Sequence, residues 1–145
     1  MSDMNIMVFL GSVGMYSFEI EFHDSNLSSV AIRSGTLELH FDMAVLLVID
    51  QFGTWLESEY HVIPATIYID EAKYKKLPQV GCIYHGDLNC TEDGKSFVGT
   101  IPVDLNINAN VIFSLMDCDG ELEIAGSKFR IVGDIDKIPV RFRTK

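Results

Sequence analysis

The stretch Met116–Asp134, MDCDGELEIAGSKFRIVGD, has two competing interpretations: a cluster of metal-binding acids, or two tight β-hairpins in series. Two turn pairs, Asp119–Gly120 and Gly126–Ser127, divide it into segments in which apolar and polar residues alternate. Such alternation is typical of strands with one buried face, and pairs of this kind close two-residue hairpins. The first turn predicts that Leu115 pairs with Ile124.

The second turn predicts a third strand beside the first two. It places Ile124 opposite Phe129 on the inner face and Glu123 opposite Arg130 on the outer face. Opposite charges on directly facing residues stabilise an antiparallel pair. Because one pattern explains the acids, the glycines and the bases together, we favour the hairpins over a metal site.

The alternative, a calcium loop, fails at two essential positions. An EF-hand loop needs an Asp five residues before its invariant glycine and a bidentate Glu six residues after it. If Gly120 is that glycine, Leu115 and Gly126 occupy these two positions. We therefore expect no calcium site.

The cysteines suggest neither zinc nor disulfides. Cys82, His85 and Cys90 have a spacing that resembles part of a zinc knuckle. The hairpin closed by Asp93–Gly94, however, is expected to turn both cysteines inward and the histidine outward. With Cys118, the three cysteines are an odd number at irregular spacing, which favours reduced, buried thiols. We expect no metal and no other cofactor.

The same alternation covers most of the chain. Residues 16–22 predict a half-buried strand, and Ser34–Gly35 predicts a hairpin that pairs Ile32 with Leu37. The turn at Asp93–Gly94 is expected to set Cys90 against Phe97 and Gly86 against Ile101. Pro102 lacks an amide proton, so it predicts an edge strand or a bulge. Residues 140–143 predict a last strand with a basic outer face.

Residues 42–59 are the exception, because their apolar side chains, Phe52 among them, follow one helical stripe. Asp42 is a good N-cap, which favours a helix here that crosses one end or face of the sheet. The β-branched residues between Met43 and Ile49 and the glycine at Gly53 argue against it. A buried strand over Met43–Ile49 is the alternative, and a weaker helical turn is expected near residues 70–77.

These patterns predict a single domain over residues 1–145. It is expected to be mainly β: an antiparallel β-sandwich or open barrel built from consecutive hairpins, with one helix around residues 42–59. No segment reaches the ~18 apolar residues that would span a bilayer, and the apolar start has no preceding basic residue. A cytoplasmic location is therefore expected.

The charge is concentrated in one half of the chain. Residues 1–72 contain eleven acids and one base, so their net charge is 1 − 11 = −10, whereas residues 73–145 contain ten of each. A negative field repels nucleic acid and anionic membranes and attracts basic proteins. Solubility alone is the simpler explanation of the surplus. The chain contains no phosphate-binding loop and no basic patch interleaved with aromatic residues, so we expect no nucleic acid or membrane as partner.

Three functions are compatible with these features. The first is a non-enzymatic protein-binding module, an acidic inhibitor or immunity-type protein that neutralises a basic partner such as a nucleic-acid-targeting toxin. The second is a small-ligand-binding protein or enzyme with a cleft near His85 and Asp87, and the third is an assembly subunit that pairs through an edge strand near Pro102 or through the terminal strand. We favour the first. Its expected partner-binding residues are Glu19, Glu21, Asp24, Glu38, Asp50, Trp55, Glu57, Glu59 and Tyr60.

Overall fold

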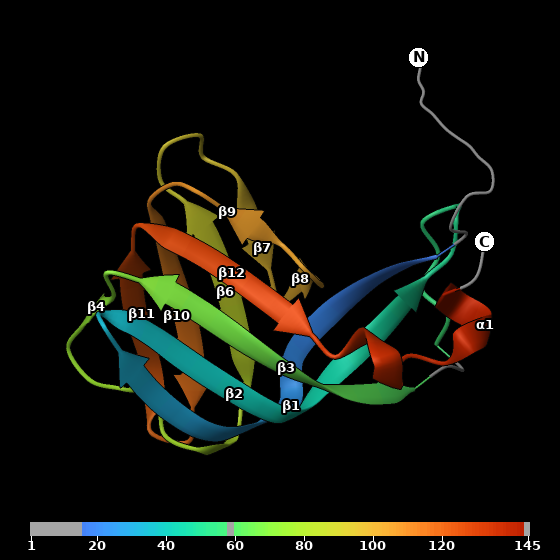
Figure 1. Cartoon of the computed structure of the whole chain (residues 1–145), viewed down its shortest axis with the longest axis horizontal. Coiled ribbons are helices and arrows are strands. Elements are labelled where there is room, and N and C mark those ends of the chain that lie inside the picture. Colours follow the sequence, from blue (N-terminus) through green and yellow to red (C-terminus); the bar gives the residue numbers. More distant parts are fainter. Residues whose placement is uncertain (1–15, 58–59, 144–145) are drawn as a thin grey trace.

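The computed structural model describes residues 16–57 and 60–143, and within them the chain forms an antiparallel β-sandwich (Figure 1). The mainly β fold expected from the sequence is confirmed. Sheet A, the larger sheet, has seven strands within these residues, and sheet B has five. No helix in the described residues is long and apolar enough to cross a membrane.

Sheet A contains the three long strands of the first half of the chain. Its members are β1 (Ser17–Arg33), β2 (Thr36–Ile49), β3 (His61–Asp70), β5 (Gly81–Cys82), β8 (Thr100–Pro102), β9 (Asn106–Ile107) and β12 (Lys128–Gly133). Sheet B contains β4 (Lys73–Tyr74), β6 (His85–Cys90), β7 (Ser96–Val98), β10 (Val111–Asp117) and β11 (Gly120–Gly126). A 3₁₀ turn, η1 (Ile135–Lys137), and one turn of helix, α1 (Val140–Arg143), follow β12.

The core lies between the two sheets and is centred on three phenylalanines. The ring of Phe113 from sheet B lies 5.4 Å from the ring of Phe22 and 5.5 Å from that of Phe129, both from sheet A. All three side chains are fully buried. Sheet B approaches so closely at Gly86 that a Cβ there would lie 2.7 Å from the Phe22 ring, which explains the glycine at the second residue of β6.

The first hairpin forms as predicted. Ser34 and Gly35 both have positive φ, 52° and 83°, as a type I′ turn requires, and Ile32 pairs with Leu37. Pro102 lies in β8, a short strand that pairs only with β1, so its predicted position at an edge is also confirmed.

Two predicted hairpins exist with a different register. Leu88, not Cys90, pairs with Phe97, because residues 91–95 form a longer connection than the two-residue turn that was expected. Leu115 pairs with Leu122, not Ile124, so the turn lies at Cys118–Asp119. Each shift is two residues, so the paired strands keep their expected faces.

The predicted pairing across Gly126–Ser127 is wrong. β11 belongs to sheet B and β12 to sheet A, so this segment is a corner between the sheets, not a hairpin. Glu123 lies opposite Ser114, and Arg130 lies opposite Tyr68. A Cβ at position 126 would overlap Ile69, so the corner requires a glycine. The expected pairing of Gly86 with Ile101 is wrong for the same reason: the chain turns from sheet B into sheet A at Gly99, which has φ 78°.

The helix predicted over residues 42–59 is also wrong, and the alternative strand is confirmed. β2 continues to Ile49 and is paired on both sides, with β1 and with β3. Ala44, Val45 and Leu46 are all buried, so strict alternation is lost and the apolar run resembles a helical stripe. The weaker helical turn expected near residues 70–77 is replaced by β4, and the strand expected at residues 140–143 is α1.

A β-bulge divides β1 into two halves. Four residues of β1, 22–25, lie between its pairs Glu21–Val45 and Asn26–Met43, whereas β2 has only one residue, Ala44, in the same interval. The buried hydroxyl of Ser25 donates to the Glu21 carbonyl oxygen at 2.7 Å and accepts from the Val45 amide at 2.9 Å. Ser25 therefore replaces the hydrogen bonds that the bulge removes.

Candidate protein-binding surface

One end of sheet A extends beyond the sandwich, to the right in Figure 1. We call it the distal arm and define it as residues 17–21 of β1, 45–49 of β2, 50–57 and 60 of the connecting loop, and 61–63 of β3. Six predicted partner-binding residues lie on it: Glu19, Glu21, Asp50, Trp55, Glu57 and Tyr60. Glu59 lies outside the described residues, and Asp24 and Glu38 lie elsewhere on the molecule.

Asp50 organises the loop at the tip of the arm. Its Oδ1 accepts hydrogen bonds of 2.9 Å from the backbone amides of Phe52 and Thr54, and its own amide donates to the Thr54 carbonyl oxygen. Gly53 completes the turn with φ 82°. The carboxylate of Asp50 therefore shapes the loop and is not a free charge for a partner.

This loop presents three aromatic side chains to solvent. Phe52 is 81% exposed, Trp55 46% and Tyr60 70%. Trp55 also forms an isolated bridge with Ile49, which ties it to the end of β2. Phe52 was missed from the sequence because it fell on the apolar stripe of the expected helix. The spacing of Asp50 and Gly53 was the signal of a turn there.

Glu19 and Glu21 project from the outer side of the arm. They alternate with Phe18 and Ile20, which lie on the inner side. The Glu19 carboxylate accepts a hydrogen bond of 2.8 Å from the Thr100 hydroxyl. Neither acid, nor the exposed Glu57, forms an ion pair with a described residue.

The basic residues of α1 are attached to the opposite side of the arm. The Phe142 ring packs against Tyr16 at 5.0 Å and against His61 at 5.9 Å. Tyr16 is two residues from Phe18, so the two side chains lie on the same face of the strand. Because Phe142 packs against Tyr16, α1 covers the inner side. The arginines of α1, including Arg143, whose Nε donates to the Ile138 carbonyl oxygen, are therefore separated from Glu19 and Glu21.

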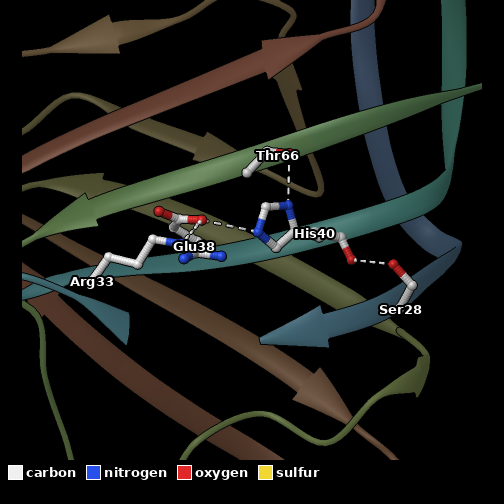
Figure 2. A network of polar contacts seen from close by, with 5 residues as sticks. All are labelled: Ser28, Arg33, Glu38, His40 and Thr66. Atoms are coloured by element: carbon white, nitrogen blue, oxygen red, sulfur yellow. Dashed lines mark hydrogen bonds and ion pairs between the residues drawn. The ribbon is translucent and has the colours of Figure 1, made fainter. Parts of the chain in front are cut away.

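Glu38 lies on β2, an inner strand of sheet A, and contacts Arg33 and His40, as Figure 2 shows. Its Oε1 lies 3.2 Å from Arg33 Nε and 3.0 Å from His40 Nε2, and the other ring nitrogen of His40 lies 3.1 Å from the Thr66 hydroxyl. The Glu38 side chain is only 13% exposed. These contacts make Glu38 part of a cross-strand network on sheet A.

Asp24 lies in the bulge of β1, apart from the arm. Its backbone has φ 68°, and its Oδ2 lies 3.5 Å from the exposed ring of His23. Asp24 and Glu38 are therefore both engaged with neighbouring residues outside the arm as defined.

His85 and Asp87, the residues of the alternative cleft, contact each other on the outer face of sheet B. His85 Nε2 lies 2.8 Å from Asp87 Oδ1, and the same oxygen accepts a hydrogen bond of 2.8 Å from the Gly99 amide. Both side chains are partly exposed. A depression of about 700 Å³ on sheet B lies at another place, between Lys73–Lys76 of one wall and Glu121–Glu123 of the other.

In the stretch Met116–Asp134, one acid, Asp117, stabilises the turn between β10 and β11. The buried Asp117 carboxylate accepts hydrogen bonds from the amides of Gln79 and Asp119, at 2.9 and 2.8 Å. It therefore joins the β10–β11 turn to the segment before β5. Across residues 16–57 and 60–143, no three His, Cys, Asp or Glu side chains are grouped to hold a metal ion.

The three cysteines are free and lie in different environments. Cys90 is buried as expected, whereas Cys82, which was expected to point inward, is exposed, as is Cys118. Burial raises the pKa of the Cys90 thiol, and the nearby Asp93 adds to this, while Lys95 opposes it. The Cys90 thiol is therefore protonated and unreactive at neutral pH.

Comparison with known proteins gives no significant match: none to a protein-family model, none to a curated protein and none to a solved structure.

Proposed function

We propose that this protein is a non-enzymatic binding module that docks onto a basic protein through its distal arm. The observation that carries the proposal is the exposure of Phe52, Trp55 and Tyr60 in one loop, on the same arm as unpaired acids. Aromatic side chains provide most of the binding energy in many interfaces, particularly Trp and Tyr. Acids beside them steer a cationic partner and set its orientation.

The location of the unpaired charge supports a docking role over solubility alone. Glu38, in the middle of sheet A, is paired with Arg33 and His40, whereas Glu19, Glu21 and Glu57 have no cationic partner among the described residues. Charges retained only for solubility need no such association with exposed aromatic residues.

The most concrete form of this proposal is an inhibitor or immunity-type protein that covers the basic active site of a toxin acting on nucleic acid. Such toxins must be basic to hold phosphates, so an acidic surface with aromatic anchors is complementary to them. The three unpaired cysteines support a reducing compartment, which includes the cytoplasm, as the place where this occurs.

The proposal can be tested by photo-crosslinking in the cells that produce the protein. A benzophenone amino acid replaces Trp55 in one variant and Val98 in the control. Val98 is 72% exposed on β7 and lies outside the aromatic loop, because the nearby Thr100 pairs with Glu21 at the base of the arm, whereas Trp55 lies at its tip. We expect position 55, but not position 98, to give a covalent adduct with a basic protein. No adduct, an acidic protein, or equal adducts at both positions would each refute the proposal.

The identified partner then allows a quantitative test. Trp55→Ala and Tyr60→Ala are each expected to weaken binding about tenfold or more, a loss of about 1.4 kcal/mol or more. Glu19→Gln with Glu57→Gln is expected to slow association and to reduce its dependence on salt. Val98→Ala is the matched control and should bind normally. Binding that is indifferent to salt would contradict the role of the acids.

A further inference from the structure

The sheet edges within the described residues are mostly closed by very short strands. β4, β5 and β9 have two residues each, and β7 and β8 have three each. Short edge strands leave few unpaired backbone groups, and this is one way in which β proteins avoid pairing with other chains. Any longer unpaired segment is therefore notable.

The last part of β1 is such a segment. On the side away from β2, β1 pairs with β8 at residues 19–21 and with β5 at residues 26–27. Residues 28–33 pair with β2 alone and have no strand on their other side within the described chain. This free edge is twice as long as the longest of the short edge strands.

The hairpin geometry shows which backbone groups face outward. The two-residue turn at Ser34–Gly35 makes Arg33 and Thr36 a hydrogen-bonded pair, and the pairs along the ladder then alternate between bonded and non-bonded. Val30–Leu39 and Ile32–Leu37 are non-bonded pairs. The amide and carbonyl groups of Val30 and Ile32 therefore point toward the free edge, where no described residue bonds to them.

The side chains of residues 28–32 on this edge are uncharged, and those of Val30, Ala31 and Ile32 are apolar. Val30 and Ile32 lie opposite Leu39 and Leu37, two fully buried residues, so they face the inner side of the sheet. Ile32 is nevertheless 51% exposed, and no described strand lies beyond it on this edge. Residues 28–32, SSVAI, contain no charge, so the edge has none of the lysines or prolines that usually prevent pairing.

A second copy of this chain fits the β1 edge. In an antiparallel pair centred on Ala31, Val30 of each copy lies opposite Ile32 of the other, and Arg33 lies opposite the uncharged Ser29. By contrast, the uncovered part of β11, which pairs with β4 only at Ile124 and Ala125, would bring Glu121 of one copy against Glu123 of the other. Like charges in directly facing positions are destabilising.

We propose that two copies of this protein associate through the free edge of β1, antiparallel and centred on Ala31, to form one continuous sheet across the dimer. Each hydrogen-bonded pair exchanges two bonds, so Val30 and Ile32 contribute about four backbone hydrogen bonds across the two-fold axis. The distal arm begins at the other end of β1. The dimer therefore carries its two arms at opposite ends and leaves both free for partners.

Sedimentation velocity of the full chain, from low to high micromolar concentration, tests the proposal. The wild-type chain is expected to shift from monomer to dimer. Ile32→Lys places a charge on the free edge and should remain monomeric, whereas the matched control Val98→Lys should dimerise like wild type. High salt should strengthen the dimer, because it screens the repulsion between two chains of net charge −10, whereas the arm's binding to a basic partner should weaken.

Hydrogen exchange on the wild-type chain provides a test that needs no variant. The Ala31 amide bonds to β2 and should be protected at all concentrations, whereas the amides of Val30 and Ile32 should become protected only as the dimer forms. A chain that stays monomeric throughout, a dimer that persists in Ile32→Lys, or amides of Val30 and Ile32 that exchange equally at all concentrations would each overturn the proposal. Circular dichroism of both variants excludes unfolding as the cause.

Discussion

The central sandwich and the distal arm contain the same residue types in different environments. In the sandwich, aromatic rings are buried between the sheets, and the carboxylate of Glu38 is paired with Arg33 and His40. On the arm, Phe52 and Tyr60 are exposed and Glu57 has no ion pair with a described residue. The difference shows that residue type alone does not determine whether a side chain is buried and paired or exposed and unpaired; its neighbours in the fold do.

The largest expected contrast is between a buried and an exposed aromatic residue. Phe113→Ala removes the ring that contacts both Phe22 and Phe129 and should lower the free energy of unfolding by about 3–5 kcal/mol. Trp55→Ala should cost about 1 kcal/mol, because half of the side chain is already exposed. Urea denaturation measures both, and equal losses would mean that the arm belongs to the core.

The second contrast concerns the junction between the two regions. Ser25→Ala leaves the Val45 amide without its acceptor in a buried site, so we expect a loss of about 1–3 kcal/mol. Ser28→Ala is the matched control, because the Ser28 hydroxyl donates to the His40 carbonyl oxygen at an exposed position (Figure 2). It should cost about 0.5 kcal/mol. Faster exchange of the Val45 amide in Ser25→Ala alone would locate the loss at the bulge.

A smaller contrast separates the paired acid from the unpaired one. Glu38→Gln should lower the free energy of unfolding by about 0.2–1 kcal/mol, because the Arg33 side of the pair is largely exposed to solvent. Glu57→Gln should leave it unchanged. Thermal unfolding at low and high salt measures the stability difference between each variant and wild type. Salt should reduce this difference for Glu38→Gln and should not affect it for Glu57→Gln. A salt-dependent difference at position 57 would contradict the unpaired state of Glu57.

The smallest effect is the pH dependence from Cys90. Since burial raises the pKa of its thiol in the folded state, the unfolded chain releases this proton first as the pH rises. The contribution of this thiol to folding stability is complete below its pKa in the unfolded chain, about 8.5, and decreases at higher pH. Cys90→Ala should therefore lose less stability than wild type between neutral and alkaline pH. In the native protein, a thiol reagent should react quickly with Cys82 and Cys118 and slowly with Cys90.

Local patterns predicted the strands well, but not which strands become neighbours. Alternation and the turn at Ser34–Gly35 specified the first hairpin correctly, because all the information lies within a few residues. Gly126–Ser127 looks like a hairpin turn locally, yet the chain crosses there to the other sheet, and the close approach of Ile69 to Gly126 comes from a strand distant in sequence. The segment ending at Ile49 was mistaken for a helix because a strand paired on both sides can be buried on both faces.

The candidate surface was only partly predictable for a related reason. Counting acids identified the half of the chain that carries the surplus of negative charge. Six of the partner-binding residues predicted in that half lie on the arm. The count could not show that Glu38 contacts Arg33 and His40, since the pairing of β1 with β2 brings Arg33 close to it. It also missed Phe52, whose exposure follows from the turn that Asp50 builds.

The pairing of β1 with β8 also has a consequence for synthesis of the chain on the ribosome. Glu19 pairs with Pro102, more than eighty residues later, so the first long strand cannot complete its hydrogen bonds until most of the polypeptide has emerged. Pairings this distant in sequence make folding slow. We expect the edges of the nascent β1–β2–β3 meander to stay unpaired until the later strands emerge. Chaperones bind such exposed edges, so we expect them to bind this intermediate.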